Sequence, residues 1–422
     1  MNENKLKTRE NIELYLGFLS ICLIPINKHW VIISMLGWFV VTLINVTLDR
    51  IQKRRININK KSLIPILILP CFYILHIIGL AYSSNLEYGF FDLEVKLSMI
   101  LIPIIILIRS SIYQNKQKLI FTSLISGVLI SFFINITHAY LNYLADGQIL
   151  NFYYCLLSPS IHPSYMAMYI GVSLIALIYY KTKLFNSGKV IRIAFPIISA
   201  VILLAYLFML SSKAGIISFA IAISVYSSIR ISQRIKPIYA IIAGIAILII
   251  PFIVINQIPS VSMRFKEMSN SIKNSKNATI DSEYGSLARL AIIQSMYQMS
   301  VENLPWGVGT GDIKVEITKY YLAKGSKLIT TQYINAHNQF AQSTIALGIP
   351  GLSILLTFLI LGLIVACKNR NIIFLSFLLL LIIQMLFESM LEQQAGVIFI
   401  TLFYSLFCIW DNKQLNNSGN TV

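Results

Sequence analysis

Twelve apolar runs restrict the folds that this sequence can adopt. Apolar residues make up 56% of its 422 residues, only 12% are charged, and the mean hydropathy is +0.73. A soluble domain of this length does not bury so much apolar surface. Lipid cannot satisfy exposed backbone groups, so each run must be a helix. The sequence therefore predicts an all-α polytopic membrane protein with about 12 transmembrane helices. The runs lie at residues 12–26, 31–48, 63–82, 97–108, 119–144, 165–180, 193–210, 215–229, 238–255, 351–367, 372–391 and 397–410.

The shortest run, residues 97–108, needs Lys96 and Arg109 to snorkel outward at its ends if it is to span. The distribution of basic residues indicates that this run is a membrane span. With twelve spans, 22 of the 34 Lys and Arg lie on the side of the N-terminus, and nine of the other 12 lie in one long loop. The positive-inside rule then predicts a multi-pass inner-membrane protein with both termini cytoplasmic. The net charge of +17 reflects this orientation rather than nucleic-acid binding.

The long loop is predicted to be external, which means periplasmic in a Gram-negative cell. It separates an N-terminal membrane bundle (1–255) from a C-terminal one (338–422), and it is itself interpreted as a catalytic loop (256–337). Within it, "SLARLAIIQSMYQMSVEN" has the periodicity of an amphipathic helix that lies on the membrane surface or against the bundle. The apolar positions are Leu287, Leu290, Ile293, Met296 or Tyr297, and Val301.

Two further stretches of the loop carry distinct signals. "LPWGVGTGDIK" has three glycines in five residues, which predicts a tight turn where backbone could approach a ligand. In "NAHNQFAQSTIALGIPGL", Asn335 is a candidate N-cap, so His337 is expected in the first helical turn. The positive end of the helix dipole disfavours imidazolium, which keeps the ring able to accept a proton. Gly348 and Pro350 are expected to interrupt the helix.

These pieces together resemble the O-antigen ligase and polymerase superfamily of bacterial polysaccharide assembly. The resemblance covers roughly residues 286–365 and rests on Arg289, the "PWGVGTGD" turn and "AHNQFAQSTIALGIPGL". Upstream, "LSSKAGIISFAIAI" is similar to another stretch of the family, although Lys213 stands where arginine is usual. "GLAYSSNLEYGFFDLEVKLSMILIP" resembles the family's weaker N-terminal pattern.

The resemblance implies transfer of a glycan from an undecaprenyl-diphosphate carrier to an acceptor sugar hydroxyl. A ligase would use lipid A–core as acceptor, whereas a polymerase would use another lipid-linked repeat; the sequence separates the two poorly, and ligase is preferred. Arg289 suits the leaving diphosphate because its planar fork binds phosphate oxygens in bidentate fashion. Lys213 is a second cation for substrate. His337 is the candidate general base, with Asn338 beside it as a substrate-binding candidate.

Three more residues are candidates for substrate binding. Glu388 and Glu392 are four apart, which predicts one helix face; they could orient His337, pair with Arg289, hold an acceptor sugar or form a structural ion pair. His162 is the second candidate base, although Pro163 after it and Ser164 as a cap also fit a plain helix start. Arginine and lysine can neutralise a diphosphate, so no metal or other cofactor is expected. The acidic stretch 281–283 is interpreted as solvated.

Two other classes of protein compete with this interpretation. A transporter or flippase usually shows two matching halves with broken helices near mid-membrane, and the sequence shows no such repeat. A structural scaffold would leave the pairing of arginine and histidine unexplained. The expected partners are the lipid-linked glycan, its acceptor and membrane lipids.

Overall fold

The structure is a computed structural model, and it describes most of the chain. The described residues are 3–54, 60–181, 184, 188–257, 262–263, 265–266, 269–270, 285–323 and 335–410. Only the backbone is described at 3–6, 189, 251–252, 254–257 and 285–291.

The described elements are all helices, and each of the twelve apolar runs lies in one of them to within a few residues. Their bounds are α1 Glu3–Leu23, α2 Lys28–Ile51, α3 Lys60–Leu80, α4 Leu86–Lys96, α5 Ser98–Ile108, α6 Ser110–Tyr113, α7 Gln117–Asp146, η1 Ile149–Phe152, α8 Tyr154–Leu157, α9 Pro163–Tyr180, α10 Lys189–Met209, α11 Lys213–Ser232, α12 Pro237–Gln257, α14 Gly285–Glu302, α15 Ile313–Ala323, α16 Gln339–Lys368, α17 Ile372–Phe387 and α18 Gln394–Ile409. Within the described residues, seven helices are long and apolar enough to cross a membrane. The chain is thus a polytopic helical membrane protein, while the count of twelve spans stays a prediction.

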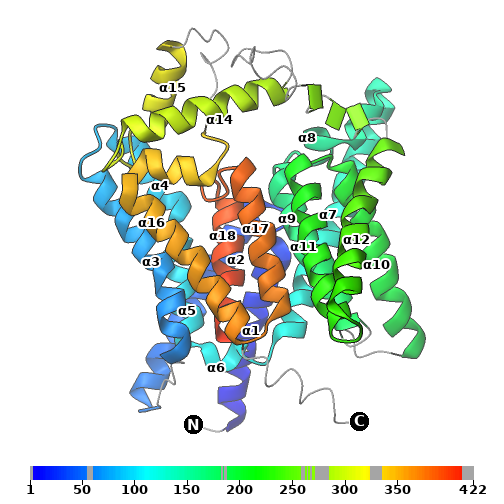
Figure 1. Ribbon diagram of the computed structural model, residues 1–422. Coiled ribbons are helices and arrows are strands. Elements are labelled where there is room, and N and C mark those ends of the chain that lie inside the picture. The colour runs from blue at the N-terminus through cyan, green and yellow to red at the C-terminus, as the bar shows by residue number, and fades with distance from the viewer. Residues whose placement is uncertain are drawn as a thin grey trace.

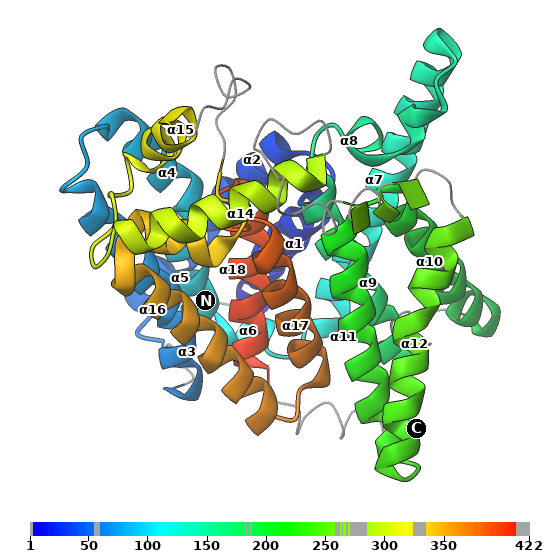
Figure 2. The ribbon, with the colours of Figure 1, turned by 45° about the horizontal axis from the view of Figure 1, so that its top comes forward.

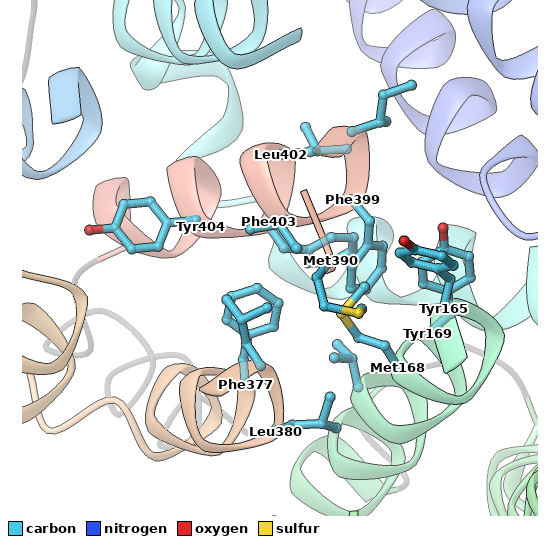
Figure 3. Packing of buried hydrophobic residues seen from close by; sticks show 14 of the residues in the cluster. Tyr165, Met168, Tyr169, Phe377, Leu380, Met390, Phe399, Leu402, Phe403 and Tyr404 are labelled. Carbon is cyan, nitrogen blue, oxygen red and sulfur yellow. The ribbon is translucent and has the colours of Figure 1, made fainter. Parts of the chain in front are cut away.

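Helices α9 and α18 form the centre of the bundle. From Gly396 to Ile409, every residue of α18 is buried, and nearly all of α9 is buried as well. A helix that is apolar all round is expected in such a position. Aromatic rings from α9, α17 and α18 interlock there, as Figure 3 shows, with Tyr169 and Phe399 ring centroids 4.5 Å apart. This core holds the ends of α9, α17 and α18 in register.

The expected snorkelling at the ends of α5 is wrong. Arg109 is 7% exposed and forms ion pairs with Glu13 at 2.9 Å and Asp49 at 2.8 Å. Lys96 is 1% exposed and pairs with carboxylates. Buried carboxylates beside them neutralise both charges, so neither side chain has to reach the headgroups.

The bundle has two distinct ends. Helices α14 and α15 lie at one end, and α6 and the first turns of α1 lie at the other (Figure 1). At the second end, the Ser62 hydroxyl donates to Cys408 O at 2.8 Å, and the Trp410 indole donates to Tyr113 O at 3.2 Å. We call these the α14 end and the α1 end. In Figures 1 and 2, α14 lies across its end of the bundle, where it packs on α16.

We expect the α14 end to face the outside of the cell. In a cysteine-free background, Trp306→Cys at the α14 end should react with a membrane-impermeant maleimide in intact spheroplasts, because Trp306 is 67% exposed. Ser232→Cys, at the exposed end of α11, should react only after permeabilisation. The reverse pattern of labelling would invert the topology.

Candidate functional site

A histidine and a carboxylate meet at the α14 end of the bundle. His337 Nδ1 lies 3.2 Å from Glu388 Oε2, and their side chains are 25% and 7% exposed. The Ser164 hydroxyl donates to the other carboxylate oxygen, Oε1, at 3.4 Å. The three residues come from the segment before α16, the end of α17 and the first turn of α9. With Glu388 ionised, Nδ1 carries the hydrogen and donates it, which leaves Nε2 as the acceptor nitrogen.

The backbone before α16 differs from the prediction. Asn338, rather than Asn335, is the N-cap, since its side-chain oxygen accepts from Ala341 N–H at 3.0 Å. His337 therefore precedes the helix and has a left-handed φ of +46°. Asn335 instead accepts the His337 N–H at 3.0 Å. Asparagine side chains favour such local turns. Asn335 and Asn338 each form one, so α16 begins later than predicted.

The start of α16 is attached to the turn between α17 and α18. The Asn338 side-chain amide donates to Leu386 O at 3.1 Å, and Gln339 Oε1 accepts the Leu391 N–H at 2.7 Å. Gln339 is 1% exposed, so its bond to Leu391 is shielded from water, whereas the Asn338 bond is exposed. Asn338 thus lies beside His337 but acts in this structure as a cap and a tether.

Glu388 and Glu392 do not share a helix face, so that prediction is wrong. Helix α17 ends at Phe387, and Glu388 is its C-cap in extended conformation. The chain then turns before α18, which sends Glu392 to Lys96, with 3.2 Å between Oε1 and Nζ. The two carboxylates consequently serve separate groups.

Glu392 belongs to a buried charge cluster that consists of His76, Asp92, Lys96, Lys314 and Glu392. Lys96 Nζ bonds to Asp92 as well as to Glu392, and His76 Nδ1 lies 3.6 Å from Asp92 Oδ2. Lys314, from α15, lies over the Tyr88 ring at 4.7 Å and interacts electrostatically with both carboxylates. The cluster connects α3, α4, α15 and the α17–α18 turn.

Electrostatics in this cluster are balanced. Burial raises the pKa of Asp92, on α4 between two expected spans, to about 6; Lys96 opposes the shift and Glu392 adds to it. Burial also lowers the pKa of Lys314, which the two carboxylates partly offset. Two lysines face two carboxylates, so the cluster holds little surplus positive charge for a diphosphate.

The glycine-rich turn after α14 lies against the backbone of α16. The sequence had predicted that this turn would approach a ligand. Val308 and Gly309 N–H donate to Ile345 O and Ala346 O at 2.8 and 2.9 Å. Pro305 O accepts the Ile349 N–H at 2.8 Å. These bonds attach the turn to α16 where Gly348, with φ +62° and ψ −147°, breaks the helical geometry. The predicted interruption of α16 is confirmed.

Helix α14 is present where amphipathic periodicity predicted it, and the predicted face is buried only in part: Met296 is buried, but Val301 is exposed. Ile292, Met296 and Met299 are buried, whereas Tyr297 and Val301 are 73% and 53% exposed. The buried side is the one against the bundle.

Arg289 lies in the first turns of α14, and its side chain is outside the described residues. The stretch 281–283 is also outside them. Both assignments stay predictions.

Lys213 and His162 lie at the same end as His337. Lys213 is the first residue of α11, which packs on α9 and α17, and it is half-buried. His162 is the N-cap of α9, since its Nδ1 accepts the Ser164 N–H at 3.3 Å. The expectation that Ser164 is the cap is therefore wrong, because its hydroxyl bonds to Glu388 instead.

Ser164 and the charge cluster are the functional candidates that sequence reasoning missed. Asp92 and Lys96 are spaced i,i+4, which is a recognisable pattern for an ion pair on one helix face. No local pattern connects Ser164 to Glu388, 224 residues away. In the described part of the chain, no three His, Cys, Asp or Glu side chains group as metal ligands would. Independence from metal stays a prediction.

The fold and site together define a polytopic helical membrane protein with a buried carboxylate–histidine pair at one end of its bundle. Residues 198–356 match the family model described as O-antigen ligase, and this match supports the resemblance to the O-antigen ligase superfamily. Members of this superfamily are membrane enzymes of the glycosyltransferase type that act on lipid-linked glycans. The match includes Lys213, Arg289 and His337 and ends before Glu388. No curated protein matches the chain.

Gly348→Ala should destabilise the protein. A Cβ at this position would lie 1.9 Å from Pro305 O, and the backbone has a positive φ. An L-residue in left-handed conformation costs about 1–2 kcal/mol, to which the clash adds. A lower midpoint in thermal unfolding in detergent is expected. The matched control is Gly37→Ala on α2, where a Cβ has open space, and its midpoint should not fall. Equal midpoints for the two variants would contradict the role of the glycine turn.

Removing the lysine of the charge cluster should also be costly. Lys96→Met leaves Asp92 and Glu392 buried without their cation, and breaking a buried ion pair typically costs about 3–5 kcal/mol. Its control is Lys319→Met, because the Lys319–Glu316 pair is largely exposed at 66% and 36%. Thermal midpoints should fall for Lys96→Met and stay unchanged for the control; a tolerated Lys96→Met would refute the neutralising role.

Proposed function

We propose that this protein transfers a glycan from undecaprenyl diphosphate to a sugar hydroxyl of lipid A–core, outside the inner membrane. The observation that carries the proposal is the contact between His337 and Glu388, at the end of the bundle that contains α14. The match of residues 198–356 to the O-antigen ligase family model supports the lipid-linked donor. In this proposal the long loop, residues 256–337, lies in the periplasm.

In this reaction His337 acts as general base. Glu388 holds the ring through Nδ1, and Nε2 takes the proton of the acceptor hydroxyl as that oxygen attacks the anomeric carbon. Ser164 fixes the carboxylate of Glu388 by donating to its second oxygen at 3.4 Å. His337 is 25% exposed and Glu388 is 7% exposed, so the base is accessible while its carboxylate partner is sheltered.

The leaving diphosphate is assigned to cations outside the charge cluster. Lys96 is occupied by two carboxylates, and Lys314 faces the same two. Arg289 and Lys213 remain as the proposed phosphate ligands, with Arg289 as the bidentate one. A guanidinium beside the diphosphate would stabilise the charge that develops on the leaving group.

The neutrality of the cluster supports ligase over polymerase. A polymerase holds two lipid-linked glycans and needs two diphosphate sites, whereas a ligase needs one. Lys96 and Lys314 are two described cations near the α14 end, and carboxylates balance both, which leaves Lys213 as the candidate for a second site. The polymerase therefore remains the alternative function.

Site variants test the mechanism. His337→Ala should lower the rate of transfer by about 10² to 10⁴-fold, the usual contribution of general acid–base catalysis. Glu388→Gln should give a smaller loss, because the amide can still contact Nδ1 but no longer stabilises imidazolium. His138→Ala, on the exposed surface of α7, is the matched control and should keep full activity. Transfer is measured with purified protein and a lipid-linked donor; a fully active His337→Ala would exclude this base.

A deletion strain distinguishes the two enzymes. Loss of the ligase should leave lipid A–core without any attached glycan, while lipid-linked chains accumulate. A polymerase mutant would instead carry a single repeat unit on lipid A–core and no long chains. Electrophoresis of the lipopolysaccharide separates these outcomes, and the second would overturn the ligase assignment.

A further inference from the structure

A polar cavity opens at the α1 end of the bundle, opposite His337. Its volume is about 920 Å³, which lies within the range of small-molecule sites. It lies between the last turns of α9, α11 and α16, the turn into α17, and the start of α3. None of the residues discussed for glycan transfer lines it.

Four basic side chains line this cavity, namely Lys61, Arg230, Lys368 and Arg370. No aspartate or glutamate is among its described lining residues. Arg230 is positioned by aromatic rings, with its guanidinium carbon 5.0 Å from the centre of the Tyr179 ring. Such a lining attracts an anion.

Helix dipoles explain only part of this arrangement. Arg230 and Lys368 are in the last turns of α11 and α16, where cations complement the dipole. That effect requires no cavity and does not account for Lys61, which is at the start of α3. The convergence of basic residues from three helices and one turn on an open volume points to a bound ligand.

An apolar groove continues from the cavity toward the membrane-facing surface. This second hollow, of about 550 Å³, shares Lys61, Lys368 and Asn369 with the first. Its other walls include Ile64 and Ile364, which are 70% and 42% exposed. A basic cavity joined to an apolar groove matches a molecule with an anionic head and a hydrocarbon tail.

We propose that the cavity and groove together bind an anionic phospholipid of the leaflet at the α1 end. The phosphodiester would lie among Lys61, Arg230 and Lys368, and one acyl chain would lie along Ile64 and Ile364. Basic pockets between transmembrane helices are known to bind such headgroups. The site is separate from the proposed glycan transfer and does not depend on it.

Native mass spectrometry of the full chain in detergent tests this site. Phosphatidylglycerol should stay bound in preference to phosphatidylethanolamine with the same acyl chains. Arg230→Gln/Lys368→Gln should weaken phosphatidylglycerol binding about 10- to 30-fold. The matched control is Lys116→Gln/Lys118→Gln, which removes two basic residues at the start of α7 that do not line the cavity, and it should bind normally.

The groove is tested separately from the cavity. Ile364→Asn should weaken binding of phosphatidylglycerol but should not change competition by water-soluble glycerol phosphate. If glycerol phosphate or inorganic phosphate binds as tightly as the lipid, the site takes a free anion and the lipid proposal fails. Equal retention of the two lipids, or unchanged binding in the Arg230/Lys368 variant, also overturns it. Thermal midpoints in phosphatidylethanolamine confirm that each variant is folded.

Discussion

The hydrogen bond from Leu391 N–H to Gln339 Oε1, at 2.7 Å, holds the candidate site together. It attaches the turn between α17 and α18 to the first residue of α16, in a position shielded from water. Because α18 is buried all round in the centre of the bundle, that turn cannot move independently of the core. Glu388 and His337 lie on opposite sides of this attachment, so their contact depends on it.

Buried basic side chains in this protein are neutralised by buried carboxylates, most of which come from other segments of the chain. Arg109 is paired with Glu13 and Asp49 near the α1 end, and Lys96 with Asp92 and Glu392 near the α14 end. Lys96–Asp92 is a pair within α4, but the pairs with Glu392, Glu13 and Asp49 join segments that are far apart in sequence, so they specify which segments are adjacent. In an apolar bundle, where burial alone distinguishes helices poorly, such pairs give directional contacts.

The glycine turn and the break in α16 form one structural unit. Gly307 and Gly348 both have positive φ, and a Cβ on either would collide with backbone of the other segment. The close approach places α14 next to α16 and brings Arg289 and His337 onto adjoining segments. The glycines thus contribute to the site indirectly, because they allow the turn after α14 to pack closely against α16.

The sequence by itself determined the class of the fold and the position of its helices. The apolar runs are long, and lipid permits only helices, so the helices that contain the twelve apolar runs follow from hydropathy. It also gave His337 as a candidate site residue, within the stretch that resembles the superfamily. The prediction that Glu388 and Glu392 share a helix face could not succeed from the sequence. Whether "FESMLEQQ" continues α17 or turns depends on contacts with Gln339 on α16 and Lys96 on α4. The tertiary structure alone decided that Glu388 meets His337, that Glu392 meets Lys96, and that Ser164 bonds to Glu388. Those contacts join residues 51 to more than 200 positions apart, and no local spacing encodes them.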